Sequence, residues 1–127
     1  QIAGNPHIRL LSPERNRARF ATLLASADAL IHGCEAETFC MAAAEARASG
    51  IPVIVPDRGG AADHARGGAG VRHAAGNAQA AAQAILDLFS GAVSLPTEPV
   101  PVVTMADHFA QLFAEYERIV NAARAAA

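Results

Sequence analysis

Short apolar runs alternate with segments of helical periodicity over the first 90 residues. Runs of this length, bounded by Gly, Pro or polar residues, are typical of strands, and intervening helical segments favour a parallel arrangement. The strand at 28–33 is expected to be buried and to end at Gly33, and Pro56 closes the strand at 51–55. The sequence predicts four strands in all: 7–11, 28–33, 51–55 and 69–73.

Helical periodicity connects these strands. Apolar residues of the first helical segment recur three and four positions apart, which places them on one face. Ser12 is expected to cap this helix, with Pro13 in its first position, and Asn77 is expected to cap the last. Gly50 ends the second helix. The predicted helices are 13–27, 38–49, 61–66 and 77–90.

Strands that alternate with helices indicate an α/β fold with a Rossmann-like parallel sheet flanked by helices. Ligands of such sheets bind beyond the carboxyl ends of the strands. Gly59 and Gly60 in the last of the loops at this edge are both free to take a positive φ. We therefore expect ligand contacts from three loops: 12–14, 33–37 and 56–60.

The pattern changes after residue 90. Three prolines in 91–104 favour an extended linker. The segment 105–127 predicts an amphipathic closing helix whose apolar stripe is most simply explained by core packing. We therefore divide the chain into a domain at 1–90, a linker and this helix. The stripe consists of Phe109, Leu112, Phe113, Tyr116 and Val120.

The charge balance argues against a nucleic-acid partner. The formal net charge is −2 and every basic residue is an arginine, so charge gives no attraction toward nucleic acid or an anionic membrane. No apolar run approaches the roughly 18–20 residues that span a bilayer, and no signal peptide opens the chain. Cys34 and Cys40 are interpreted as reduced thiols, which are typical of a cytoplasmic protein.

Two acidic residues bracket a stretch that is otherwise small and apolar. Glu37 follows a predicted strand, and Glu45 lies within the helix that comes next, about 12 Å further along its axis. Helical side chains lean toward the N-terminus, which brings Glu45 back toward the sheet edge. The free amides at the helix start, together with the helix dipole, favour a phosphate. These amides belong to Thr38, Phe39, Cys40 and Met41.

One class of ligand satisfies all of these features. Carboxylates accept hydrogen bonds from neighbouring sugar hydroxyls. A ribose on Glu45, a diphosphate at the helix start and a hexose on Glu37 together describe a nucleotide-sugar. The sequence therefore predicts a nucleoside-diphosphate sugar as the partner of this site.

The stretch ADALIHGCEAETFCMAAAEARASGIPVIVPDRGG resembles the donor-binding, C-terminal half of retaining glycosyltransferases with the GT-B fold, the large GT4 class or glycosyl transferases group 1. That family carries two glutamates in an E-x7-E motif, followed by G-x-P-V and a glycine-containing loop. The resemblance covers roughly 7–90, and the final helix resembles the family's closing helix. The matching residues are Glu37, Phe39, Glu45, Ala46, Gly50, Pro52, Val53, Gly59 and Gly60.

The resemblance implies a role for each group. Glu37 would be the catalytic residue, which contacts the hexose and steadies the developing positive charge, and Glu45 would bind the ribose. The amides near Cys40 and Met41 would hold the diphosphate. The other implied substrate-binding residues are Thr38, Phe39 and Gly33, together with Leu11 and Ser12 near the base.

For the full-length protein, the resemblance implies transfer of a hexose with retention, without a metal or other cofactor. The chain would be a partial C-terminal half of the GT-B fold that lacks its first strand-helix units. Its partner would be the missing N-terminal GT-B domain, and we do not expect the chain alone to catalyse transfer. We expect the full-length protein in the cytoplasm, with peripheral membrane association as an alternative.

The chain departs from the family pattern in two respects. The family usually has Gly at the position of Cys40, so this thiol either crowds the diphosphate or turns aside. The basic residues that clamp the diphosphate come from an earlier strand-helix unit in the family. Two other functions stay open, namely a sugar-nucleotide epimerase of the same architecture and a degenerate, non-catalytic binding module.

Simpler interpretations stand beside these roles. Glu37 could be a plain N-terminal helix charge, and Glu45 a solvated helix residue. For Cys40 a packing role is the simpler interpretation. For His32 it is a half-buried side chain with its hydrogen bonds satisfied within the protein. Arg15, Arg17 and Arg19 are interpreted as the solvated face of the first helix, and Arg58 as a solvated loop residue. No metal site is predicted, because no metal-like spacing relates His7, His64, His73 and His108.

Overall fold

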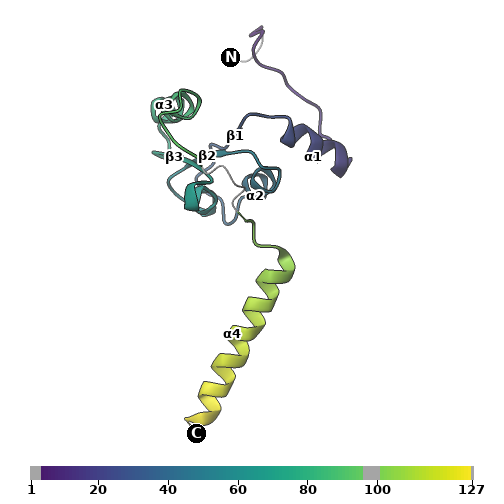
Figure 1. The fold of residues 1–127 in the computed structure, drawn as a ribbon, viewed down its shortest axis with the longest axis vertical. Helices are drawn as coiled ribbons and strands as arrows, with labels where there is room; N and C mark the ends of the chain where they lie inside the picture. Colours follow the sequence, from purple (N-terminus) through teal and green to yellow (C-terminus); the bar gives the residue numbers. More distant parts are fainter. Residues whose placement is uncertain (1–3, 96–100, 127) are drawn as a thin grey trace.

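The computed structural model describes residues 4–95 and 101–126. Within them, three parallel strands form one sheet in the order β1-β2-β3 (Figure 1). The strands are β1 (Leu30–Ile31), β2 (Val53–Pro56) and β3 (Gly70–His73). Leu30 pairs with Val53, and Val53 in turn pairs with Gly70. The predicted α/β class and parallel sheet are confirmed.

Helices connect the strands and cover the sheet. α2 and η1 pack on β2, and α3 packs on β2 and β3. α1 packs against α2 and lies away from the strands (Figure 1). The bounds are α1 (Arg17–Ala25), α2 (Met41–Ala48), the 3-10 helix η1 (Gly60–Gly68), α3 (Ala78–Phe89) and α4 (Met105–Ala125).

The core lies around the central strand. All four residues of β2 are buried, with Val53, Ile54 and Val55 fully enclosed. Val53 and Val55 face a cluster of small residues from α2 and η1, because alternate residues of a strand point to opposite faces. Small side chains let both helices approach the strand closely. The α2 and η1 members of this cluster are Ala43, Ala46, Ala61 and Ala65, with Cys40 at the start of α2.

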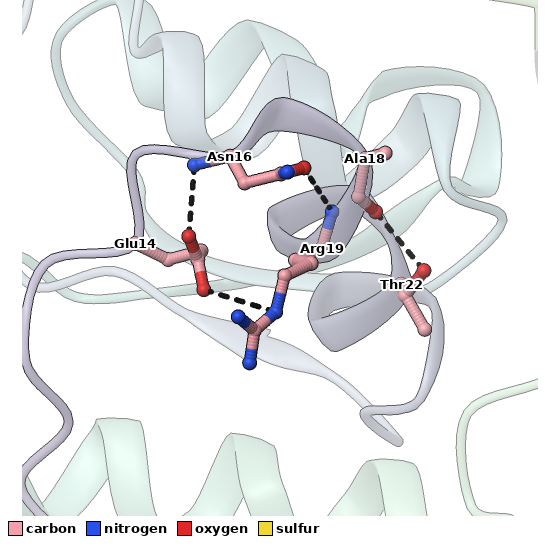
Figure 2. Close-up of polar contacts among 5 residues, drawn as sticks. All are labelled: Glu14, Asn16, Ala18, Arg19 and Thr22. Atoms are coloured by element: carbon pink, nitrogen blue, oxygen red, sulfur yellow. Dashed lines mark hydrogen bonds and ion pairs between the residues drawn. The ribbon is translucent and has the colours of Figure 1, made fainter.

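The first predicted helix begins four residues later than expected. α1 starts at Arg17, and its cap is Asn16, whose side-chain oxygen accepts from the Arg19 amide at 3.1 Å (Figure 2). Glu14 accepts from the Asn16 amide at 2.8 Å, which fixes the turn before the helix (Figure 2). The predictions of Ser12 as the cap and Pro13 as the first helical residue were therefore wrong, because this turn sets the start of the helix.

The N-terminal side of the sheet is smaller than predicted. Residues 7–11 do not form a strand, and the large side chains of Leu10 and Leu11 are exposed. The predicted strand at 28–33 is reduced to Leu30–Ile31, with Ile31 54% exposed. Within the described residues β1 pairs with β2 alone, so its outer edge is uncovered and the prediction of a buried strand was wrong.

The second helix also starts later than predicted. α2 begins at Met41 because Cys40, with φ at +66°, breaks the helical conformation before it. Thr38 and Phe39 consequently lie in a bend outside the helix. In the following loop Gly59 has a positive φ of +69°, whereas Gly60 does not and instead opens η1. η1 runs past the predicted 61–66 to Gly68, with a kink at Arg66 and Gly67.

The later elements agree more closely with the sequence. Asn77 caps α3, as predicted, by accepting from the Ala80 amide at 3.0 Å. β3 matches the predicted strand at 69–73 within one residue. α4 follows the predicted closing helix and is capped by Thr104. The predicted linker lies partly, at 96–100, outside the described residues, as does Ala127 at the end of the predicted helix.

α4 projects away from the sheet as a long single helix (Figure 1). None of its residues from Met105 to Ala125 is buried, so the prediction of core packing for its apolar stripe was wrong. Its aromatic side chains contact one another instead, and the Phe109 and Phe113 ring centroids lie 5.9 Å apart. In the part of the chain described, no helix is long and apolar enough to cross a membrane.

Candidate functional site

Glu37 lies beyond the carboxyl end of β1, at the edge where ligands of parallel sheets bind. Its carboxylate Oε1 is 3.4 Å from Nε2 of His32, which directly follows β1. Both side chains are partly buried, with 34% of Glu37 and 19% of His32 exposed. The backbone of Glu37 is fixed as well, because its carbonyl accepts from the Gly60 amide at 2.7 Å.

The glycine loop presses directly against the segment that carries Glu37. A Cβ atom on Gly60 would lie 2.2 Å from the carbonyl oxygen of Thr38, and one on Gly59 would lie 2.4 Å from that of Glu35. Real Cβ atoms do not approach backbone oxygens this closely. Gly59 and Gly60 therefore allow the backbone of their loop to approach the backbone of residues 35–39 closely, and this contact sets the position of that segment.

Phe39 holds this segment from the other side. Its carbonyl oxygen lies 2.5 Å from Nε2 of His64 in η1, and because a carbonyl can only accept, this nitrogen carries the proton. The Phe39 and His64 rings meet edge to face with centroids 4.9 Å apart. His64 is buried, and its part in holding the site was missed, because sequence reasoning considered this residue only as a metal ligand.

The structure decides between the two alternatives for the Cys40 thiol, which were to crowd the diphosphate or to turn aside. Its side chain is only 4% exposed and belongs to the core cluster beneath β2. The thiol has therefore turned inward, and it does not protrude from the start of α2. The carbonyl of Cys40 accepts from the amides of Ala43 and Ala44, at 3.1 and 3.2 Å.

The start of α2 therefore presents a different set of free amides from the one predicted. The first helical amides belong to Met41 and Ala42, which precede the amides bonded to Cys40. Thr38 and Phe39 lie outside the helix, so their amides are not aligned with its dipole. Met41 was predicted from the sequence, whereas Ala42 was not.

Glu45 lines a groove between α1 and α2. The groove has a volume of about 440 Å³, and it combines apolar residues with both signs of charge. Figure 2 shows how Glu14, Asn16 and Arg19 fix the start of α1, which forms one wall. The lining residues are Glu14, Arg15, Arg17, Phe20, Ala21, Leu24, Glu45, Ala48 and Ser49.

Arg15 and Arg17 are exposed, in agreement with their interpretation as a solvated face, and both also line the groove with Glu45. The signal that could have identified them is their place next to the 12–14 loop, which the strand order assigns to the ligand-bearing edge. Leu11 and Ser12 are exposed and are not part of this lining. Gly33 is exposed beside His32, with open space where a Cβ would stand.

The structure thus places the two acidic residues of the motif against different neighbours. Glu37 lies beside His32 at the end of β1, and Glu45 lines the groove together with Arg15 and Arg17. The first turn of α2 lies between them in the sequence. A parallel α/β sheet whose loops and a helix start follow the carboxyl ends of its strands defines a class of folds in which ligands bind at that edge.

Comparison with known families gives the particular member of this class. The family model of glycosyl transferases group 1 matches residues 4–98. This is more than half of the chain, and the chain belongs to that family. The predicted resemblance to glycosyl transferases group 1 is thereby confirmed.

Characterised relatives match a shorter part of the chain. A GDP-mannose-dependent alpha-mannosyltransferase of Mycolicibacterium smegmatis is 50% identical over 50 residues, which are 39% of this chain and 13% of that protein. Proteins of the same description from Mycobacterium tuberculosis and Corynebacterium glutamicum are each 54% identical over 43 residues, or 34% of this chain. These stretches cover 11% and 10% of the two relatives. No solved structure matches significantly.

Proposed function

We propose that this chain is the donor-binding part of a glycosyltransferase that transfers a hexose from a nucleoside-diphosphate sugar with retention. The observation that carries the proposal is the groove that Glu45 lines together with Arg15 and Arg17, next to the helix that Glu37 precedes. Because the relatives are described as GDP-mannose-dependent, GDP-mannose is the first donor to test.

The nucleoside end of the donor fits the groove. The carboxylate of Glu45 can accept hydrogen bonds from both hydroxyls of a ribose. Phe20 and Leu24 supply apolar surface in the same groove, where a base can exclude water. Its volume of about 440 Å³ lies within the range of roughly 300–1,000 Å³ that small-molecule sites have.

The diphosphate fits the region between the two acidic residues. The amides of Met41 and Ala42 and the dipole of α2 favour an anion at the helix start. Arg15, which precedes α1, and Arg17, its first residue, add positive charge to the lining of the groove, and arginine binds phosphate through paired N–H donors. Fixed donors of this kind can stabilise a leaving diphosphate without a metal ion.

Glu37 is then placed for the chemical step. A carboxylate next to the anomeric carbon stabilises the positive charge that develops on the sugar as the bond to the diphosphate breaks. His32 lies beside Glu37, with its Nε2 3.4 Å from the carboxylate. The glycine loop and His64 hold the segment in place, so Glu37 need not reorganise during the reaction.

The proposal extends to domain organisation. Residues 1–90 bind the donor, 91–104 are the linker, and the closing helix follows. The N-terminal domain of a GT-B enzyme would be the partner that supplies the acceptor site, so the chain alone would bind donor without transferring sugar.

Nucleotide titration of the chain tests this proposal. We expect GDP to bind and Glu45→Gln to weaken it about 10- to 100-fold, because hydrogen bonds to a charged group contribute about 1.5–3 kcal/mol. Glu35→Gln is the matched control, because Glu35 is exposed and outside the groove. Saturation-transfer NMR with GDP, UDP and ADP gives the measurement.

Two outcomes would count against the proposal. If folded protein binds none of the three nucleotides, the donor site does not exist. If Glu45→Gln binds GDP as well as the parent chain does, the groove is not the nucleoside site, and the alternative of a degenerate binding module gains. Product analysis of the full-length protein separates transfer from epimerisation.

A further inference from the structure

Three different metal-ligating side chains converge where β1 ends and α2 begins. Nε2 or Nδ1 of His32, a carboxylate oxygen of Glu37 and Sγ of Cys40 all lie within 4.8 Å of one another. We propose that these three residues form a binding site for a thiophilic divalent cation such as Zn²⁺. The spacing of histidines along the sequence gave no indication of this group, because its ligands are of three different residue types.

His32 has a ring nitrogen that is available to bind a cation. Nε2 of His32 is buried, and it has no hydrogen-bond partner among the described residues. Its distance of 3.4 Å to the Glu37 carboxylate exceeds a good hydrogen bond. A buried polar atom without a partner is costly, and a cation between the imidazole and the carboxylate would satisfy both groups.

Cys40 supplies the ligand that makes the site selective. Its backbone has φ at +66°, a conformation that residues with a side chain rarely adopt. Its side chain is buried beside His32 and Glu37, so the thiol is directed toward the other two ligands.

The ligand set matches the chemistry of zinc. Tetrahedral Zn²⁺ binds His nitrogen and carboxylate oxygen at about 2.0–2.2 Å and thiolate sulfur at about 2.3 Å, and open sites use three protein ligands plus water. Such bonds place ligand atoms roughly 3.3–3.8 Å apart, so the three side chains need to close by about 1 Å. Binding displaces the thiol proton of Cys40 to solvent.

Occupation of this site has a consequence that rests on the proposed function. A cation bound to Glu37 removes the carboxylate that faces the donor hexose. Zn²⁺ would then compete with sugar-nucleotide binding, and the site would make the domain sensitive to metal.

Titration of the chain with Co²⁺ tests the metal site directly, because a cobalt–thiolate bond gives a charge-transfer absorption that carboxylate and imidazole do not. We expect this band in the parent chain and its loss in Cys40→Gly, which suits the positive φ. Cys34→Ser is the matched control and should keep the band, since Cys34 is the other free thiol and is exposed. Competition with Zn²⁺ then gives the affinities.

For Zn²⁺ we expect Cys40→Gly and His32→Gln each to weaken binding by at least about 10- to 100-fold, the range found for groups that only support a ligand. Absence of the thiolate band in folded parent chain would overturn the proposal. Its loss in Cys34→Ser and retention in Cys40→Gly would overturn it as well. Neither result depends on nucleotide binding, so failure of the donor site would be seen separately.

Discussion

Cys40 occupies a backbone conformation that ordinarily suits glycine. A left-handed conformation costs a residue with a Cβ atom about 1–2 kcal/mol, and Cys40 has φ at +66°. Burial of its side chain in the core cluster offsets part of this cost. The conformation also ends the bend before α2 and thereby decides which amides open the helix.

We expect Cys40→Gly to be more stable than Cys40→Ala by about 1 kcal/mol, although glycine normally destabilises. Both variants lose the sulfur, but only alanine keeps the strained positive φ. Urea unfolding of the two variants measures the difference. If Cys40→Ala proves the more stable, strain at this position is not significant.

At Gly60 the constraint is space, since its φ is not positive. A Cβ there would stand 2.2 Å from the Thr38 carbonyl oxygen. We expect Gly60→Ala to destabilise the chain by about 1–3 kcal/mol, as overpacking does, and to weaken GDP-mannose binding by displacing Glu37, which faces the hexose in the proposed complex. Gly33→Ala is the control for stability, because nothing lies within 4 Å of its added Cβ. Equal melting temperatures for both variants would contradict this account.

At the scale of elements, the starts of α1, α3 and α4 are each set by a local polar contact. Asn16 caps α1 and Asn77 caps α3. α4 has a full capping box, in which Thr104 and Asp107 exchange hydrogen bonds. The hydroxyl of Thr104 donates to the Asp107 carboxylate at 2.6 Å. Such contacts involve residues three positions apart, so they form whether or not the helix packs against anything.

The capping box makes the start of α4 sensitive to acid. The Thr104 hydroxyl, and then its amide, lower the pKa of Asp107 by hydrogen bonds to the carboxylate. A folded-state pKa below the unfolded value means that the contribution is present above about pH 4 and is lost as pH falls through the folded pKa. We expect helix content, measured by circular dichroism, to fall with acidification in that range.

Thr104→Ala should remove this acid-dependent loss and should lower helix content at neutral pH. The Glu115–Arg118 ion pair of α4 is present in both proteins, so the difference between their pH profiles isolates the cap. Identical pH profiles for parent and variant would show that the box contributes nothing.

The whole molecule divides into a packed α/β part and a projecting helix. β2 is buried between helices, whereas α4 projects away from the sheet (Figure 1). The α4 side chains of Phe109, Phe113, Tyr116 and Val120 are exposed. The free energy of folding therefore comes mainly from the layers around β2. In the described residues, Arg47 of α2 contacts the segment before α4, by donating to the Pro101 carbonyl at 3.0 Å.

Substitutions in the two parts should differ sharply. We expect Ile54→Ala to destabilise the chain by about 2–5 kcal/mol, because Ile54 is fully buried. Phe113→Ser should change stability by no more than about 0.5 kcal/mol, since its side chain is exposed. Urea unfolding of both variants provides the measurement, and a large loss in Phe113→Ser would show that α4 packs on the α/β part.

The sequence by itself determined the α/β class, the order of most elements, the Asn77 cap and the family. These features depend on residues a few positions apart, and their periodicity and spacing can be read along the chain. Only the tertiary structure decided that Cys40 is buried, that Arg15 and Arg17 share a groove with Glu45, and that the stripe of α4 is uncovered. Burial and side-chain direction depend on which distant segments are present to pack against a residue, and a local pattern does not contain that information.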